Sequence, residues 1–143
     1  MANLLSVKFK YLMQLGAVDL ASDAFRIILM EPNYTFSEDF DDTYADVSAS
    51  ELPTAYGYTV NGQLLSGVSI TESEAENLST VTWNPVSWTV CDGQLATSGA
   101  IIYDDTVSSP VANPIVGWID FGGTQTLNQY AVLAITNLKL IQR

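Results

Sequence analysis

The spacing of hydrophobic positions changes early along the chain. Residues 3–15 carry large apolar side chains at helical spacing, and Gly16 follows as a residue suited to end a helix. Residues 24–30 then form a continuous apolar run of strand length, interrupted only by Arg26. The pattern predicts an N-terminal α-helix over residues 3–15 and a first β-strand over residues 24–30.

The rest of the chain alternates large apolar residues with small or polar ones, as half-buried strands do. Val81–Trp83 and Trp88–Val90 are the clearest examples. A tight hairpin is predicted between residues 56–60 and 63–65, because the Asn-Gly pair between them supplies the positive φ angles that such a turn needs. Further strands are predicted over residues 68–71, 100–103, 115–121, 130–136 and 138–141.

Short strands that follow one another closely favour a sandwich or barrel over βαβ units. The length of 143 residues and the apolar content of 48% are those of one globular domain. We therefore predict a mainly β fold, an antiparallel β-sandwich or barrel-like domain with an N-terminal α-helix and a long acidic loop. This single β-rich domain spans residues 1–143, with the helix at 3–15, the acidic loop at 31–55 and the β-strands within 56–141.

The acidic loop is the most unusual segment of the sequence. Residues 31–55 hold seven acidic and four aromatic side chains without one Lys or Arg. Loops of this length inside a compact domain are usually functional or ordered by a partner. One interpretation is contact with a partner subunit, and the alternative is packing of the loop over its own domain. The candidate partner-contacting residues are Glu38, Asp39, Phe40, Asp41, Asp42 and Tyr44.

The available residue types argue against an enzyme. The sequence contains no His, so Ser–His–Asp and Cys–His arrangements cannot be built. Cys91 is the only cysteine, which excludes an intrachain disulfide and a cysteine-based zinc site. Its strand context predicts a buried, unreactive thiol. We predict no catalytic residues and no cofactor.

Calcium is the one metal that the acidic loop suggests, because hard cations prefer carboxylate oxygens. The EF-hand register fails for the run that begins at Asp39. Tyr44 stands where a glycine is needed, and Ser50 stands where the bidentate glutamate is needed. A looser calcium site is an alternative to a solvated or partner-facing loop, which we prefer. No metal site is predicted.

The charge of the chain limits its partners. Sixteen acidic and five basic side chains give a net charge of −11, which repels phosphate and anionic lipid. We therefore expect neither a nucleic acid nor a membrane as partner, and the apolar run near the N-terminus is too short to span a bilayer. A charged fraction of 15% is low for the exterior of a monomer. This favours a homo-oligomer, either a dimer or a trimer, or a covering partner.

Seven short segments stand out for the order in which they follow one another. They are residues 15–20 (LGAVDL), 25–30 (FRIILM), 46–51 (DVSASE), 57–59 (GYT), 81–83 (VTW), 100–104 (AIIYD) and 115–122 (IVGWIDFG). In this order they resemble a family of small virion proteins of tailed bacteriophages, the capsid decoration or cement proteins. The resemblance implies a virion protein on the outer capsid surface, with the major capsid protein as partner. It implies no catalytic residues.

Two other functions are alternatives to capsid decoration. Another virion component, such as a head–tail connector or tail protein, would be present in few copies at one vertex. A particle-displayed carbohydrate-binding module would need exposed aromatic rings, for which Trp83, Trp88 and Trp118 are candidates. The apolar neighbours of these three residues favour packing in the core instead.

Overall fold

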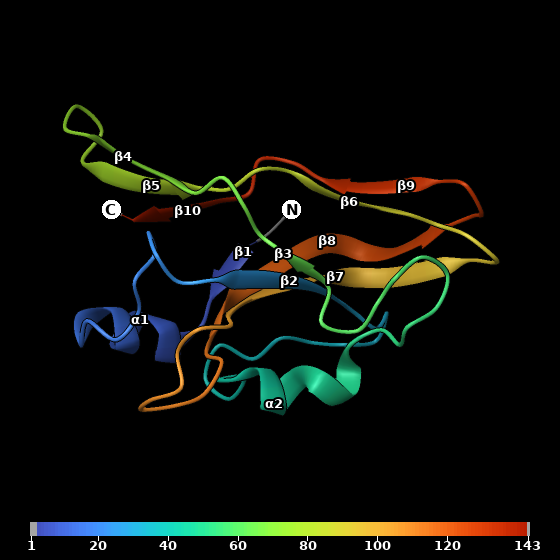
Figure 1. Ribbon diagram of the computed structural model, residues 1–143, viewed down its shortest axis with the longest axis horizontal. Helices are drawn as coiled ribbons and strands as arrows, with labels where there is room; N and C mark the ends of the chain where they lie inside the picture. The colour runs from blue at the N-terminus through green and yellow to red at the C-terminus, as the bar shows by residue number, and fades with distance from the viewer. Residues whose placement is uncertain (1–2, 143) are drawn as a thin grey trace.

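The computed structural model describes residues 3–142 and is mainly β, as the sequence predicts. Its largest element is a five-stranded antiparallel sheet (Figure 1). In spatial order the strands are β1 (Asn3–Leu5), β8 (Ile115–Leu127), β7 (Leu95–Asp104), β2 (Phe25–Met30) and β3 (Gln63–Leu64). The sheet ends at β1 on one side and at β3 on the other, so it is open and does not close into a barrel.

Two smaller antiparallel sheets lie over one face of the main sheet, which gives a sandwich-like arrangement (Figure 1). One sheet contains β10 (Lys139–Gln142), β5 (Leu78–Thr82) and β4 (Ser69–Ser73), and the other contains β6 (Val86–Thr89) and β9 (Val132–Ile135). The larger hydrophobic core fills the space between the layers. It includes Phe25, Ile27, Leu29, Trp83, Trp88, Ile102 and Ile119.

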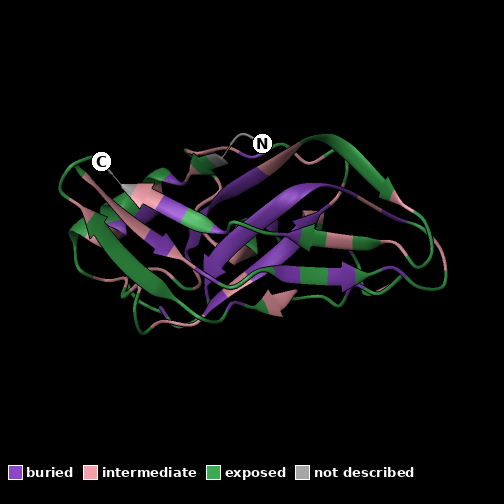
Figure 2. Ribbon diagram, turned by 90° about the horizontal axis from the view of Figure 1, so that it is seen from above, coloured by how far each residue is buried: buried purple, intermediate pink, exposed green. Residues whose placement is uncertain are grey.

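The central strands are buried on both faces, because a second core lies on the other side of the main sheet. Along β2, Ile27 and Leu29 belong to the larger core, whereas Ile28 and Met30 belong to the second one. This explains why residues 25–30 form a continuous apolar run instead of an alternating one. Figure 2 shows the central strands buried along most of their length. Each buried Ile or Leu side chain of these strands contributes roughly 1.5–3 kcal/mol to the stability of the fold.

The N-terminal helix is shorter than predicted. Helix α1 spans Val7–Gln14, and the first residues of the predicted segment 3–15 form β1 along the edge of β8. That edge offers backbone N–H and C=O groups that need partners, and this pairing outweighs the local helical pattern. Phe9 and Leu12 face the protein interior, and Gly16 ends the helix with a φ of 72°, as predicted. No described helix is both long and apolar enough to cross a membrane.

The predicted hairpin between residues 56–60 and 63–65 does not form, although its turn does. Asn61 and Gly62 have φ angles of 77° and 61°, but the chain then enters β3, which pairs with β2. A Cβ at Gly62 would collide with the carbonyl oxygen of Ile27. Glycine is therefore needed for β3 to reach the edge of the main sheet.

The other predicted strands are present with shifted ends, and β7 and β8 are much longer than predicted. Cys91 is exposed, so the prediction of a buried thiol is wrong. The side chains of Trp88 and Val90 point inwards, and the alternation along the strand turns Cys91 outwards. Core packing of the three tryptophans is confirmed, since Trp83, Trp88 and Trp118 are at most 7% exposed.

Candidate partner-binding surface

The acidic loop, residues 31–55, covers the second face of the main sheet. It contains a short helix, α2 (Tyr44–Val47), followed by a 3-10 turn, η1 (Ser48–Ser50). Figure 1 shows α2 on the opposite side of the main sheet from the two smaller sheets. The backbone N–H of Leu52 donates to the carbonyl oxygen of Leu29 at 3.0 Å, which ties the end of the loop to β2.

Three of the four aromatic side chains in the loop pack inwards. The rings of Tyr34 and Phe36 lie against Trp118, with centroids 5.3 Å and 6.4 Å away. The ring of Tyr44 stacks on Tyr103 at 4.8 Å. For these residues, packing over the protein's own domain is the better interpretation. Tyr44, a candidate contact residue, therefore has an internal role.

Glu51 anchors the end of the loop as a buried carboxylate, 6% exposed. It accepts hydrogen bonds from the hydroxyl of Tyr44 at 2.6 Å, from the hydroxyl of Tyr58, and from the N–H of Asn61 at 2.8 Å. Burial, reinforced by the hydrogen bonds to Glu51, raises the pKa of both tyrosines above the ordinary value. Both hydroxyls therefore stay protonated and satisfy a buried acid by hydrogen bonding.

Two further acids shape the turns of the loop. One oxygen of Asp41 accepts the hydroxyl of Tyr34 at 2.7 Å and the N–H of Ser37 at 2.8 Å. One oxygen of Asp46 accepts the N–H and the hydroxyl of Thr43 at 3.0 Å and 3.1 Å, just before α2 begins. Asp41, although a candidate contact residue, is thus engaged within the loop.

Another candidate, Phe40, is an exposed aromatic ring at the tip of the loop. Phe40 is 79% exposed, and the neighbouring Asp39 is also exposed. The backbone carbonyl of Glu38 accepts the N–H of Val7 at 3.0 Å, which holds this part of the loop against the start of α1. The structure therefore brings the tip of the acidic loop next to the helix.

A cleft lies between the loop and α1. It is lined by Val7, Lys8, Tyr11, Asp39 and Asp42. The amine of Lys8 lies 3.8 Å from the carboxylate of Asp42 and 5.8 Å from the centre of the Tyr11 ring. The side chains of Val7 and Tyr11 are about half exposed, at 47% and 50%. We call these five residues together with Phe40 the α1–loop surface.

The helical half of this surface was missed by the sequence analysis, which placed the contact residues in the loop alone. Val7 and Tyr11 are four residues apart, so they share one face of α1. Phe9 and Leu12 occupy the buried face of the same helix. Val7 and Tyr11 are an apolar and an aromatic residue that lie off the buried face of α1. The sequence does not show that the acidic loop packs beside them.

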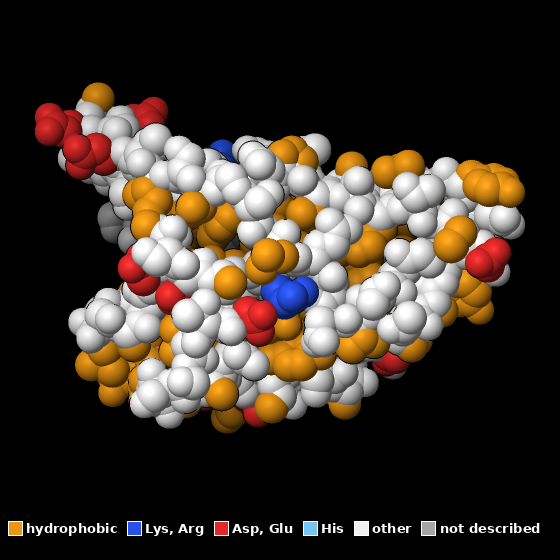
Figure 3. All heavy atoms as spheres, in the orientation of Figure 1, with side chains coloured by type: hydrophobic (Ala, Val, Ile, Leu, Met, Phe, Trp, Pro, Cys, Tyr) orange, Lys and Arg blue, Asp and Glu red, His pale blue; other side chains and the backbone are white. Residues whose placement is uncertain are grey.

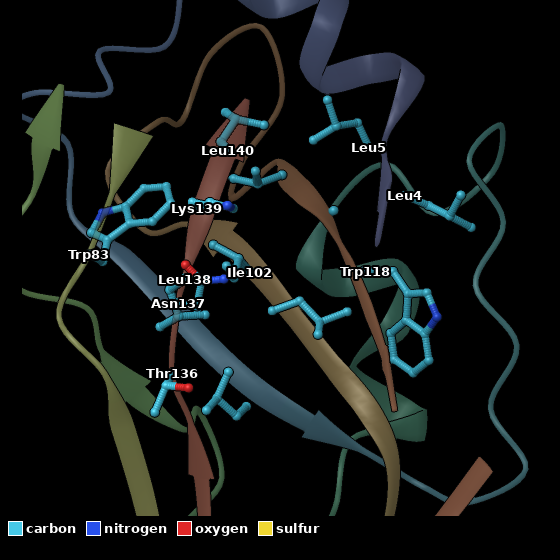
Figure 4. A pocket seen from close by; sticks show the side chains of 14 residues that line it. Leu4, Leu5, Trp83, Ile102, Trp118, Thr136, Asn137, Leu138, Lys139 and Leu140 are labelled. Atoms are coloured by element: carbon cyan, nitrogen blue, oxygen red, sulfur yellow. The ribbon is translucent and has the colours of Figure 1, made fainter. Parts of the chain in front are cut away.

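The space between the two layers is small for a small-molecule ligand. Figure 4 shows side chains from several segments around a narrow gap, among them Leu5, Trp83, Ile102, Leu138 and Leu140. The gap measures about 60 Å³, whereas small-molecule pockets usually measure ~300–1,000 Å³. It is therefore a packing space between the sheets.

A second acidic surface lies at the tip of the hairpin formed by β4 and β5. Glu72, Glu74 and Glu76 are exposed there, and Figure 3 shows acidic side chains on this projecting tip. Within residues 3–142, no three Asp, Glu or Cys side chains are grouped to hold a metal ion.

Comparisons with protein-family models, with curated proteins and with solved structures found no match to this chain. A sandwich-like β fold does not by itself assign a function, because such folds carry many. The features that bear on function are the α1–loop surface, the charge of the chain and the resemblance of its segments.

Proposed function

We propose that this protein is a capsid decoration (cement) protein of a tailed bacteriophage, which binds the outer capsid surface and stabilises the shell. The observation that carries the proposal is the α1–loop surface, where the exposed Phe40 and Tyr11 accompany the carboxylates of Asp39 and Asp42. Exposed aromatic groups rimmed by polar ones are typical of protein contact sites. The resemblance of the sequence to decoration proteins supports the same proposal.

The chemistry of the surface indicates what the partner must offer. Burying Phe40 and Tyr11 against another protein would contribute roughly 25 cal/mol for each Å² of apolar area, less the cost of association. Asp39 needs a positive group opposite it when water is excluded, and Asp42 has Lys8 of its own chain 3.8 Å away. The chain has only five basic side chains, so we place most of the complementary charges on the partner, the major capsid protein.

The net charge of −11 favours the outside of the shell. A protein on the inner surface would face packaged DNA, whose phosphates repel an acidic chain. On the outer surface the same charge improves solubility. The proposal therefore includes neither a nucleic acid nor a membrane as partner.

We further propose that the protein acts as a homo-oligomer, a dimer or a trimer. Each copy would bridge capsid subunits through a modest contact, and the symmetry of the oligomer and of the shell would multiply these contacts. Decoration of this kind stabilises the particle by interface burial alone, so it requires no catalytic group.

Cryo-electron microscopy of particles with and without the protein tests this function. We expect additional density at repeated positions on the outer shell, with α1 and the acidic loop facing the capsid. Density in a few copies at one vertex would instead support a connector or tail role and would contradict decoration.

A further inference from the structure

The last residue of β7, Asp104, is a fully buried carboxylic acid, 0% exposed. Its Oδ1 accepts the N–H groups of Thr106 at 2.8 Å and of Val107 at 3.2 Å, which closes the turn after the strand. Its Oδ2 is buried too and receives no hydrogen bond from an N–H or hydroxyl donor among the described residues. An ionised carboxylate here would leave a charged oxygen buried and unpaired, which is costly.

A second carboxyl group, that of Asp23, lies beside Asp104 in the segment that leads into β2. One oxygen of Asp23 accepts the N–H of Asp19 at 2.9 Å, and the carboxylate of Asp19 is used by the N–H groups of its own turn. The guanidinium of Arg26 on β2 is paired with Asp105 at 3.0 Å. Two acids therefore meet without a described cation to neutralise them.

The pKa of Asp104 is raised to about 7, first by burial and then by the hydrogen bond that it shares with Asp23. The N–H groups of Thr106 and Val107 favour the ionised form and offset part of this rise. A negative charge on Asp104 would be buried and would lie beside a second carboxyl group, so Asp104 retains its proton at mildly acidic pH. That proton gives the otherwise unpaired Oδ2 a hydrogen to donate.

We propose that Asp23 and Asp104 share one proton and that this proton fastens the segment before β2 to the loop after β7. Other bonds cross the same junction. The N–H of Ala24 donates to the hydroxyl of Thr106 at 2.8 Å, and the N–H of Asp105 donates to the carbonyl of Ala24 at 2.7 Å. A proton suits the pair better than a metal ion, because no third ligating acid or cysteine joins it within the described chain.

The loop that starts at this junction also supports the acidic loop. The carbonyl of Asn113 accepts the N–H of Tyr44 at 2.9 Å, and the N–H of Ile115 donates to the carbonyl of Asp42 at 2.9 Å. Thr43 and Pro114 form a β-bridge between the same two segments. Loss of the shared proton places two negative charges where this loop begins, so residues 42–44 are held less firmly at high pH.

The direction of the pH effect follows from proton linkage. Folded Asp104 keeps its proton up to about pH 7, whereas the unfolded chain releases it near the ordinary pKa of 3.8. Between these values the folded state binds the extra proton, so the stability from the pair is full in acid and falls as the pH rises towards 7. Each pH unit in this range changes the unfolding equilibrium constant by up to about tenfold.

Thermal unfolding of the full chain at pH 5 and at pH 8 tests the proposal. Asp104→Asn keeps an oxygen for Thr106 and Val107 and presents an amide donor to Asp23. Glu74→Gln is the control, because it removes one carboxylate at the exposed tip of the β4–β5 hairpin. We expect the melting temperature of the parent and of Glu74→Gln to fall by several degrees from pH 5 to pH 8, and that of Asp104→Asn to fall by less than half as much.

A fall in Asp104→Asn as large as in the parent and the control would overturn the proposal. Asp23→Asn supplies the same test if Asp104→Asn does not fold. Calcium that raised the melting temperature of the parent at pH 8, but not of Asp104→Asn, would also overturn it by showing that a cation fills the place of the proton.

The link to the acidic loop has its own measurement on the isolated protein. The hydrogen-exchange protection factor of the Tyr44 amide, measured by NMR, should drop between pH 5 and pH 8 in the parent and stay constant in Asp104→Asn. Equal drops in both proteins would refute the link. No capsid is needed, so failure of this inference would leave the proposed function untouched.

Discussion

At the scale of single residues, the acidic side chains of the loop differ in what their oxygens contact. Glu51 and Asp41 accept hydrogen bonds from tyrosine hydroxyls and backbone N–H groups, so they hold the loop in shape. Asp39 is exposed beside Phe40 in the sequence. Asp42 forms an ion pair with Lys8 and lines the cleft between the loop and α1. The charge of the loop therefore serves both folding and, in our proposal, attachment.

Replacement of Glu51 tests its folding role. In Glu51→Gln, the amide nitrogen cannot accept a hydrogen bond, so at least one of its buried donors loses its acceptor. We expect the free energy of unfolding to fall by about 1–3 kcal/mol, the usual cost of an unsatisfied buried polar group. Chemical denaturation followed by fluorescence measures this change.

The matched control is Glu74→Gln at the exposed tip of the β4–β5 hairpin, which changes the same charge. Surface substitutions of this kind usually stay within about 0.5 kcal/mol. Equal midpoints of denaturation for Glu51→Gln and Glu74→Gln would show that the carboxylate of Glu51 does not anchor the loop.

At the scale of elements, the turn before β3 depends on the absence of a side chain at Gly62. Gly62→Ala places a Cβ against the carbonyl oxygen of Ile27 on β2, in addition to the strain of a positive φ. Gly16→Ala is the matched control, since Gly16 has a similar φ of 72° but open space around it. We expect about 1–2 kcal/mol of destabilisation for the control and a distinctly larger loss for Gly62→Ala.

Denaturation curves of the two glycine variants, measured side by side, separate the steric effect from the backbone effect. Equal losses of unfolding free energy would mean that β3 can shift away from Ile27 without cost. In that case the pairing of β3 with β2 would not depend on the glycine.

The sequence predicted elements best where the cause is local. The run at residues 25–30, the glycine that ends α1 and the Asn-Gly turn were all recognised from neighbouring residues. The sequence did not predict β1, and it predicted the wrong partner for β3, because both strands pair with strands far away in the sequence. Local periodicity does not report such partners.

The candidate site shows the same limit. Composition located the acidic and aromatic residues of the loop, and Phe40 is indeed exposed. The inward packing of Tyr34 on Trp118 joins residues that lie far apart in the sequence, so no local pattern could reveal it. The contribution of Val7 and Tyr11 was missed for the same reason, since it depends on how the loop docks beside α1.

At the scale of the whole molecule, we expect the isolated protein to associate. Twelve large hydrophobic side chains are exposed on the described chain, and the charged fraction of the sequence is only 15%. Light scattering coupled to size-exclusion chromatography should give two or three times the monomer mass at micromolar concentration. A single species of 15.5 kDa would contradict the proposed homo-oligomer.

The attachment of an acidic protein to a shell should also respond to salt. The screening length falls from about 10 Å at 0.1 M to about 3 Å at 1 M ionic strength, so particle binding should weaken over this range. The double variant Asp39→Asn with Asp42→Asn should lose most of this salt dependence. The double variant Glu74→Gln with Glu76→Gln, which has the same net charge, should keep it, and the reverse result would place the contact on the β4–β5 hairpin.

Occupancy on particles tests whether the α1–loop surface attaches the protein to a capsid. Purified parent, Phe40→Ser and Tyr130→Ser would each be added to particles that lack the protein, and bound copies would be counted. Tyr130 is the matched control, since it is 78% exposed, close to the 79% of Phe40, but lies in the connection between β8 and β9.

We expect Phe40→Ser to bind at least tenfold more weakly, because loss of an aromatic hot-spot contact costs about 2 kcal/mol or more. Tyr130→Ser should decorate particles as the parent does, and both variants should fold normally. Equal occupancy for the parent and Phe40→Ser would contradict attachment through the α1–loop surface.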